Sequence, residues 1–250
     1  MSSGFEPDWP TPGGVRSWVT TRTDGVSQSP YQGLNLATHV GDREGDVMVN
    51  REALQQQLAL SSPIQWLNQL HSTIVARLPF TAASIPVADG AWSDQAGVAC
   101  AVLSADCLPI LLTEPGGKAV AALHAGWRGL SAGMIQQGVA NFHQPADQLI
   151  AWLGPAIGQS SYEVGDEVRS CFIDQNPEAE HHFIPSEGGN WLASMEGLAR
   201  QQLQQLGVKA IYGGGWDTYS DQEQFFSYRR RAVTGRFATL IWIEEQEGEA

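Results

Sequence analysis

Three residues that could bind a metal or attack a substrate each lie beside a short apolar segment of this chain. Cys107 lies between two such segments, and His124 directly follows a third. His71 lies farther upstream, at the end of residues 65–70. Because strand ends are rigid, a thiol and imidazoles held there could bind a soft metal or form a nucleophile and its general base.

The spacing of these three residues leaves their chemistry open. A zinc enzyme commonly has three protein ligands and one open position, and two histidines with one cysteine fit that description. The gaps of 36 and 17 residues, however, match no compact metal motif. Ordinary burial and a metal-free Cys-His pair therefore remain as alternatives. Cys100 and Cys171 are expected to be small buried side chains, inside a strand and a helix respectively.

The residues beside Cys107 and His124 also have two interpretations each. Asp106 could orient a histidine or act as a general acid or base, but aspartate is equally suited to a turn between strands. Trp127 and Arg128 could stack on a flat ring and bind an oxyanion, or could fill the core and pair at the surface. The neighbouring Gly126 and Gly129 favour a ligand site, because glycine allows close approach of the backbone.

The spacing of apolar residues predicts the elements that must position this chemistry. Strands are predicted over residues 15–21, 65–70, 98–103, 108–113, 118–123, 149–153, 208–212, 225–229 and 236–243. Helices are predicted over residues 46–60 with Asp46 as N-cap, over the segment after Gly129, and over residues 162–174 and 190–206, the last ended by Gly207.

Strands and helices do not alternate strictly along the chain, which favours an α+β fold of mixed β-sheets flanked by helices. We find no repeat or linker in the sequence, so residues 1–250 are expected to form a single domain. Residues 1–8 and 244–250 are expected to be its frayed ends.

Composition narrows the class of partner. The chain of 250 residues carries 27 acidic residues and 14 Lys or Arg residues, a formal net charge of −13. This argues against nucleic acid and against an anionic membrane as partners. No apolar stretch approaches the roughly 18 residues that span a bilayer. The first residues lack a secretory signal, so the three cysteines are expected to be thiols or metal ligands in the cytoplasm.

Longer motifs resemble those of one protein family. They are Thr21-Arg22, Asn35-Leu36, His39-Val40-Gly41-Asp42, Gln69-Leu70-His71, Ala105-Asp106-Cys107-Leu108-Pro109, His124-Ala125-Gly126-Trp127-Arg128-Gly129, Leu153-Gly154-Pro155 and Phe225-Phe226-Ser227-Tyr228-Arg229-Arg230. From about Trp9 to Ile243, the chain resembles the YfiH family, also called laccase-domain or polyphenol oxidase proteins and now described as purine nucleoside phosphorylases. The resemblance implies a YfiH-like fold.

The resemblance also implies roles for individual residues. His71, Cys107 and His124 would bind zinc and, together with Asp106, would take part in catalysis. The implied reactions are phosphorolysis of adenosine, inosine and S-methyl-5′-thioadenosine, and deamination of adenosine. Purine nucleosides and phosphate would then be the partners. They would be bound by a further set of side chains: Arg22, Asn35, Arg128 and Arg229.

Two other activities remain open at this point. A copper-dependent polyphenol oxidase needs closely spaced histidine pairs, and the six histidines of this chain include no His-x-His pair, which favours zinc over copper. A Cys-His hydrolase that edits peptidoglycan precursors would use Cys107 as the nucleophile and His124 as the base.

Overall fold

Two packed β-sheets form the centre of the molecule. The computed structural model describes residues 3–81 and 85–245, and within these residues the strands form three sheets. The largest has the strand order β12 (Ala210–Gly213), β8 (Ile150–Leu153), β6 (Leu108–Thr113), β7 (Val120–Ala125), β4 (Gly90–Ser93) and β3 (Val75–Arg77). The second has the order β1 (Gly4–Phe5), β2 (Val15–Thr20), β13 (Phe237–Ile243) and β5 (Cys100–Ser104). The smallest consists of β10 (Phe183–Pro185), β11 (Trp191–Ala193) and β9 (Glu163–Val164).

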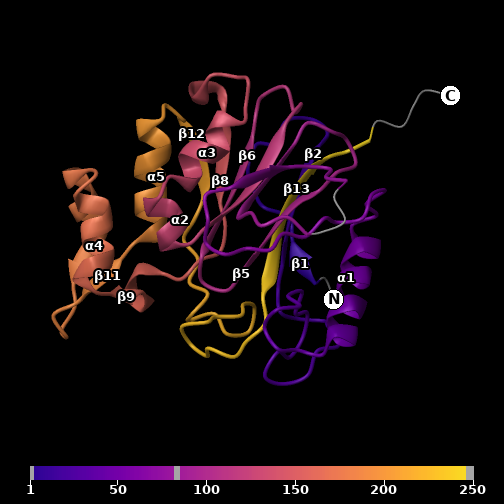
Figure 1. The fold of residues 1–250 in the computed structure, drawn as a ribbon, viewed down its shortest axis with the longest axis horizontal. Coiled ribbons are helices and arrows are strands. Elements are labelled where there is room, and N and C mark those ends of the chain that lie inside the picture. The colour runs from indigo at the N-terminus through magenta and orange to yellow at the C-terminus, as the bar shows by residue number, and fades with distance from the viewer. Residues whose placement is uncertain (1–2, 82–84, 246–250) are drawn as a thin grey trace.

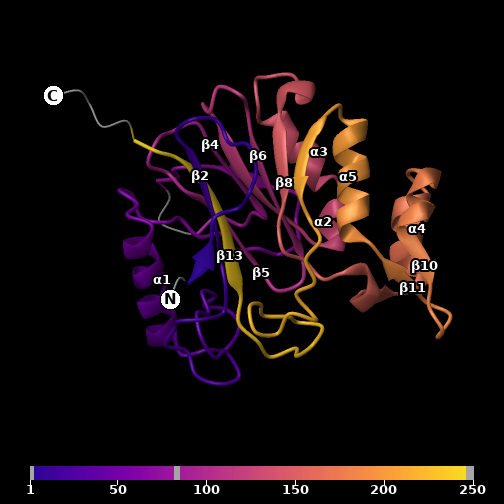
Figure 2. The ribbon, with the colours of Figure 1, turned by 180° about the vertical axis from the view of Figure 1, so that it is seen from behind.

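Helices cover the two outer faces of this pair of sheets. The α-helices are α1 (Glu44–Gln57), α2 (Trp127–Ser131), α3 (Met134–Ala140), α4 (Asp166–Ile173) and α5 (Met195–Gln205). Short 3-10 helices are η1 (Ala146–Gln148), η2 (Gln159–Ser161) and η3 (Pro177–His182). Helix α1 lies on one side of the molecule, near β1 and β13, whereas α2, α3 and α5 lie on the other side (Figure 1). The view from behind shows the same order, with α4 farthest from α1 (Figure 2).

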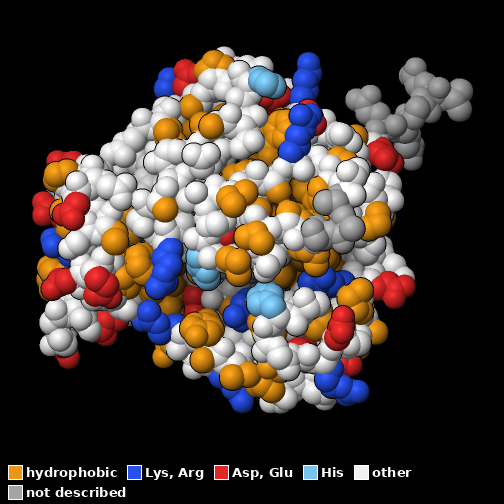
Figure 3. All heavy atoms as spheres, in the orientation of Figure 1, with side chains coloured by type: hydrophobic (Ala, Val, Ile, Leu, Met, Phe, Trp, Pro, Cys, Tyr) orange, Lys and Arg blue, Asp and Glu red, His pale blue; other side chains and the backbone are white. Residues whose placement is uncertain are grey.

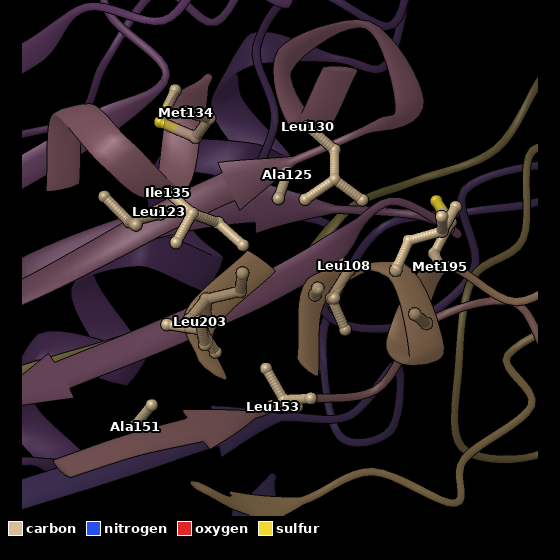
Figure 4. Close-up of a cluster of buried hydrophobic side chains, with 14 of the residues drawn as sticks. Leu108, Leu123, Ala125, Leu130, Met134, Ile135, Ala151, Leu153, Met195 and Leu203 are labelled. Carbon is tan, nitrogen blue, oxygen red and sulfur yellow. The ribbon is translucent and has the colours of Figure 1, made fainter. Parts of the chain in front are cut away.

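A large apolar cluster joins the six-stranded sheet to α2, α3 and α5. The sheet contributes Leu108 and Leu123, and the helices contribute Leu130, Met134 and Leu203. These side chains point toward one another from strand and helix (Figure 4). They are at most 1% exposed, so burying each of them stabilises the fold by about 1.5–3 kcal/mol.

Strands β5 and β6 are buried on both faces. In β5, Val102 packs between the two sheets, whereas Leu103 packs in the cluster shared with α1. In β6, Leu111 faces the other sheet, whereas Ile110 faces the helices. Strands covered on both faces need no polar alternation, so they read as continuous apolar runs. Helix, sheet, sheet and helix thus follow one another as layers, and the predicted α+β class is confirmed.

The four-stranded sheet holds the chain near both ends of the described residues. Gly4 and Phe5 pair with β2, and the Glu244 N–H donates to the Gly14 carbonyl at 2.7 Å. Backbone hydrogen bonds therefore hold Gly4, Phe5 and Glu244, three of the residues expected to fray. Residues 1–2 and 246–250 lie outside the described residues.

The predictions of strands over residues 65–70 and 225–229 are wrong. Residues 65–70 make only an isolated bridge, at Asn68, because side chains take the place of backbone pairing there. The Gln69 amide donates to the Leu103 carbonyl at 2.9 Å and accepts from the Leu103 N–H at 2.8 Å. Residues 225–227 are irregular and residues 228–229 lie in a turn, so the apolar pattern reflects burial of the Phe225 and Phe226 rings in a loop.

The first predicted helices have different bounds from those observed. Helix α1 begins at Glu44 with Arg43 as its N-cap, so Asp46 lies in the first turn and is not the cap. The helix predicted after Gly129 is divided into α2 and α3, because Gly133 between them has φ 99°. Such a left-handed conformation ends helical hydrogen bonding and is easiest for glycine.

The later predicted helices begin too early. Residues 163–164 and 191–193 form β9 and β11, which pair with each other before α4 and α5 begin. Ser194 then caps α5, its Oγ accepting from the Gly197 N–H at 3.0 Å. Gly207 follows the end of α5 with φ 99°, as predicted. No helix in the described part of the chain is long and apolar enough to cross a membrane.

Candidate metal centre and its cavity

The structure brings His71, Cys107 and His124 together. One ligand atom from each lies within 4.8 Å of the other two, and Cys107 Sγ lies 3.8 Å from His71 Nε2. The two imidazole rings meet edge to face, with centroids 5.1 Å apart. Within residues 3–81 and 85–245, this is the one group of three or more His, Cys, Asp or Glu residues that could hold a metal ion.

Cys107 lies where the chain crosses from one sheet to the other. Strand β5 belongs to the four-stranded sheet and β6 to the six-stranded sheet, and residues 105–107 connect them. The turn is tight, since Asp106 has φ 92°, a conformation that residues other than glycine rarely adopt. The Ser104 hydroxyl donates to the Cys107 carbonyl, which fixes the end of the crossing.

His124 lies inside β7, which ends at Ala125 and not at residue 123 as predicted. It pairs with Pro109 on β6, and the next pair is Ala125 with Leu108. Cys107 directly precedes β6, so the thiol and this imidazole lie on neighbouring strands. Sheet pairing alone therefore places two of the three candidate ligands side by side.

A buried aspartate that sequence reasoning missed, Asp89, joins the two histidines. Its Oδ1 accepts from His124 Nδ1 at 2.9 Å and from the His71 N–H at 3.0 Å. Its Oδ2 accepts from the N–H groups of Leu70 and Ser72 at 3.1 and 2.6 Å, and from the Ser72 hydroxyl at 2.8 Å. Because His71 has φ 60°, these bonds hold a strained backbone in place. Engaging Nδ1 leaves His124 Nε2 for a metal.

The charges of this group depend on one another. Burial alone would raise the pKa of Cys107, but the His124 charge and hydrogen bonds from His124 and His71 lower the pKa to about 6. Burial opposes protonation of His124, but the Cys107 thiolate and the Asp89 hydrogen bond raise its pKa to about 9. In the metal-free chain, the thiolate of Cys107 and the protonated form of His124 therefore stabilise each other.

The side chains of His71 and Cys107 fit beside the neighbouring backbone only because residue 126 is a glycine. A Cβ built on Gly126 would lie 2.8 Å from Cys107 Sγ and 2.9 Å from His71 Cδ2. No real Cβ approaches other atoms so closely, so Gly126 is required by the thiol and imidazole that converge there.

The three side chains line a cavity of about 510 Å³. Figure 3 shows histidine and basic side chains gathered near the centre of one face of the molecule. The other lining residues are aromatic, basic, polar or apolar: His39, Gln69, Leu103, Ser104, Ala105, Asp106, Trp127, Arg128, Ile157, Tyr162, Tyr228, Arg229 and Arg236. A volume of this size suits a small molecule such as a nucleoside.

Two of the four predicted substrate-binding residues line this cavity. The Arg128 guanidinium lies 4.3 Å from the centroid of the Trp127 ring. The Arg229 guanidinium donates to the Glu163 carbonyl at 2.8 Å and lies 5.1 Å from the centroid of the Tyr162 ring. Both arginines therefore sit against aromatic walls of the cavity.

The other two, Arg22 and Asn35, lie outside the cavity lining. Arg22 donates to the carbonyls of Gln222 and Gln32 at 3.0 and 3.4 Å, so it ties loops together. Asn35 is fully buried, and its Oδ1 accepts from the Arg236 N–H at 2.9 Å. Both residues thus pack loops together, and Asn35 also holds the backbone of the cavity residue Arg236; their contact with substrate stays a prediction.

Asp106 lines the cavity, and both of its carboxylate oxygens are engaged. Oδ1 accepts from the Thr218 hydroxyl at 2.7 Å, and Oδ2 accepts from the Arg229 N–H at 2.6 Å. Of its two interpretations, this geometry favours the structural one, in which Asp106 holds residues 218–229 against the metal centre.

Sequence reasoning also gave no role to four other residues of the lining: His39, Tyr162, Tyr228 and Arg236. His39 and Tyr228 occur within the motifs that carry the family resemblance, but their types alone do not assign a function. Asp89 offered even less signal, because it is a single aspartate between apolar residues.

Comparison with known proteins identifies the family. The family described as multi-copper polyphenol oxidoreductase laccase matches residues 16–244. The chain belongs to this laccase family. Its relatives include a protein from Pseudomonas aeruginosa named purine nucleoside phosphorylase, which is 45% identical over 98% of this chain and 100% of its own length. The Escherichia coli purine nucleoside phosphorylase YfiH is 44% identical over 97% of this chain and 100% of its own length.

Solved structures of similar proteins have the same fold. A Neisseria meningitidis protein of the family DUF152 superposes with a TM-score of 0.94, at 45% identity over 98% of this chain and 100% of that one. YlmD from Geobacillus stearothermophilus gives a TM-score of 0.87, at 31% identity over 93% of each chain. A Bacillus licheniformis protein titled YfiH gives a TM-score of 0.86, at 25% identity over 92% of this chain and 93% of that one. The YfiH-like fold expected from the motifs is therefore confirmed.

Proposed function

We propose that this chain is a zinc-dependent purine nucleoside phosphorylase acting on adenosine, inosine and S-methyl-5′-thioadenosine, with adenosine deamination as a second activity. The observation that carries the proposal is the convergence of His71, Cys107 and His124 in a cavity of about 510 Å³. The names of the relatives support the same reaction class.

The residues present fit a metal ion. Two imidazoles and a thiolate form a donor set that zinc prefers, and the Cys107–His71 distance of 3.8 Å suits ligands around one ion. Gly126 keeps the space between them free of a Cβ, and Asp89 orients His124 from behind. A metal held by these three side chains would supply a Lewis acid at one wall of the cavity.

The cavity also offers what a nucleoside requires. The Trp127 and Tyr162 rings give flat apolar surfaces for a purine, and Arg128 and Arg229 place positive charge beside them. In phosphorolysis, a phosphate oxygen forms a bond to C1′ of the ribose while the C1′–N9 bond breaks. Its electron pair leaves with the purine, which takes up the proton that hydrogen phosphate loses. Purine and ribose 1-phosphate are the balanced products.

Incubation of the zinc-loaded protein with inosine tests the proposal. We expect hypoxanthine and ribose 1-phosphate when phosphate is present, and neither without it. His71→Ala, Cys107→Ala and His124→Ala should each abolish zinc binding and cleavage, whereas His143→Ala, outside the cavity lining, should retain both. Adenosine incubated without phosphate should yield inosine. Cleavage of inosine at equal rates with and without phosphate would contradict the phosphorylase assignment.

One further observation favours a second candidate, a metal-free Cys-His hydrolase acting on peptidoglycan precursors. In such enzymes a nucleophile is followed by a base and then by a carboxylate that orients the base. Cys107, His124 and Asp89 would take these three roles in that order, and His124 Nδ1 lies 2.9 Å from Asp89 Oδ1. Chelation separates the two candidates. Activity that survives complete zinc removal but is lost on alkylation of Cys107 would favour the hydrolase.

Copper is the alternative metal, and its site requirements differ. A multicopper oxidase needs several histidine clusters, whereas the described residues contain one group with two histidines and a cysteine. Elemental analysis of protein purified without added metal decides between the ions. About one zinc ion per chain is expected for a single three-ligand site. Stoichiometric copper together with oxidation of phenols would refute the zinc assignment.

A further inference from the structure

Basic side chains outnumber acidic ones around the cavity. His39, Arg128, Arg229 and Arg236 line it, and Asp106 is the acidic residue among the lining. This is unusual for a chain with a formal net charge of −13. A local excess of positive charge that faces a cavity is typical of a site for an anion.

Arg236 is the most withdrawn of the three arginines. Arg128 and Arg229 are exposed at the cavity, whereas Arg236 is only partly accessible. Its Nη1 donates to the carbonyls of Thr234 and Gly235, both at 2.9 Å. Within the described part of the chain, its Nε and Nη2 have no hydrogen-bond partner and no acidic residue forms an ion pair with it. A partly buried guanidinium with free donors calls for an anionic ligand.

The fold places Arg236 beside the metal centre. Arg236 directly precedes β13, and Phe237, the first residue of that strand, pairs with Ser104 at the end of β5. The chain crosses to Cys107 from this same point. Burial lowers the pKa of Arg236, while the negative charges of Cys107 and Asp106 raise it, so its guanidinium lies within electrostatic reach of both.

His39 faces the same part of the cavity. It lines the cavity with Arg236, and no acidic residue of the described chain forms an ion pair with it. Burial and then the positive charge of Arg236 lower the pKa of His39. The lowered pKa favours the neutral imidazole, which still carries one N–H donor, so an oxyanion beside Arg236 would accept hydrogen bonds from both side chains.

We propose that Arg236 and His39 form the subsite for the inorganic phosphate that attacks the nucleoside. The assignment rests on the phosphorylase activity proposed above. The guanidinium would donate Nε and Nη2 hydrogen bonds to two phosphate oxygens, a geometry that arginine fits well. Asn35 holds the Arg236 backbone through its 2.9 Å bond, which gives this buried asparagine a positioning role.

Steady-state kinetics with inosine and phosphate test the subsite in the zinc-loaded protein. Arg236→Gln should raise the KM for phosphate about tenfold or more, because it removes a charge-assisted bond, and should leave the KM for inosine within about twofold. Arg236→Lys should fall between wild type and Arg236→Gln, and His39→Gln should raise the phosphate KM less. Arg231→Gln is the matched control, since Arg231 is exposed and outside the lining. A raised KM for inosine with an unchanged KM for phosphate would overturn the proposal.

Calorimetric titration of inorganic phosphate into the same proteins separates this subsite from the activity. Wild type and Arg231→Gln should bind phosphate, and Arg236→Gln should bind it about tenfold more weakly or worse. If inosine is not cleaved but this order is found, the proposed function fails and the subsite stands. If wild type does not bind phosphate, or Arg236→Gln binds it equally, the subsite fails even where cleavage occurs. Should Arg236→Gln not fold, the weaker binding expected of Arg236→Lys and His39→Gln decides.

Discussion

Asp89 Oδ1 lies 2.9 Å from His124 Nδ1, and the two side chains are 0% and 6% exposed. The same oxygen accepts the His71 N–H at 3.0 Å. One buried carboxylate therefore orients the imidazole of one candidate ligand and the backbone of another. Neither histidine can move far without breaking a bond to Asp89, so Asp89 preorganises the candidate metal centre although it is not one of the three candidate ligands.

Asp89→Asn is expected to weaken metal binding about 10- to 100-fold, as the loss of an orienting carboxylate does elsewhere. The asparagine amide would also place a donor against N–H and O–H groups that donate to Asp89. Competition with a chromophoric chelator measures the zinc affinity. Asp94→Asn is the matched control, because Asp94 pairs with Arg77 at the surface and should change the affinity little. Equal affinities of Asp89→Asn and wild type would contradict the role of Asp89.

The stabilising effect of Asp89 should depend on pH. Burial opposes ionisation of Asp89, but hydrogen bonds from His124 and Ser72 lower its pKa from 3.8 to about 2. Because the folded pKa is below the unfolded one, the stabilisation is present above pH 4 and is lost as the pH falls toward 2. Urea unfolding of the metal-free protein should show Asp89→Asn less stable than wild type by about 2 kcal/mol at pH 6. A difference that grows as the pH falls from 4 to 3 would be the wrong sign.

Gly126→Ala should eliminate metal binding while the fold persists. The added Cβ would lie within 3 Å of both Cys107 Sγ and His71 Cδ2, so one of these side chains must leave its position. Circular dichroism and metal analysis of the purified variant check the two halves of this prediction. Gly45→Ala in α1, where a Cβ meets nothing within 4 Å, should bind zinc normally. Stoichiometric zinc in Gly126→Ala would show that the crowding is relieved elsewhere.

Cys107 should be alkylated faster than the other cysteines in metal-free protein. Its pKa is lowered to about 6, so the reactive thiolate persists down to that pH, and its rate should fall about tenfold per pH unit below it. Burial raises the pKa of Cys100, which should stay unreactive. Iodoacetamide labelling followed by peptide mass spectrometry gives each rate. Zinc should protect Cys107, and labelling that zinc leaves unchanged would argue that this thiol is not a ligand.

Trp127→Leu is expected to raise the KM for inosine about tenfold, the effect of losing one stacked base. Trp191→Leu is a close control, because Arg169 lies 4.1 Å from the centroid of the Trp191 ring, much as Arg128 lies 4.3 Å from that of Trp127. Trp191 is outside the cavity lining, so its variant should keep the wild-type KM. If both variants raise the KM equally, the loss reflects the fold and not contact with the purine.

The sequence allowed the pairing of Cys107 with His124 to be anticipated for a physical reason. Each lies beside a long apolar run, and runs buried on both faces form adjacent central strands. His71 could be linked to them only through the family resemblance, because it follows no strand. Its position depends on the Gln69 amide and on the Asp89 carboxylate, which are contacts between residues distant in sequence.

The surroundings of the metal centre were harder to predict for the same reason. Arg22 and Arg236 are both arginines at the end of a loop or strand, yet of these two Arg236 lines the cavity. The difference arises because β13 pairs with β5, more than a hundred residues earlier in the chain. No local pattern records a pairing of that separation, so the sequence could not show which arginine faces inward.

The place of β13 has a consequence for biosynthesis. This strand lies between β2 and β5, and it is made after every other strand of the described chain. Until residues 237–243 leave the ribosome, β2 and β5 lack their common neighbour, and Arg236 has no fixed place beside Cys107. The four-stranded sheet and the wall of the cavity beside Cys107 can therefore form only after translation of this strand is finished.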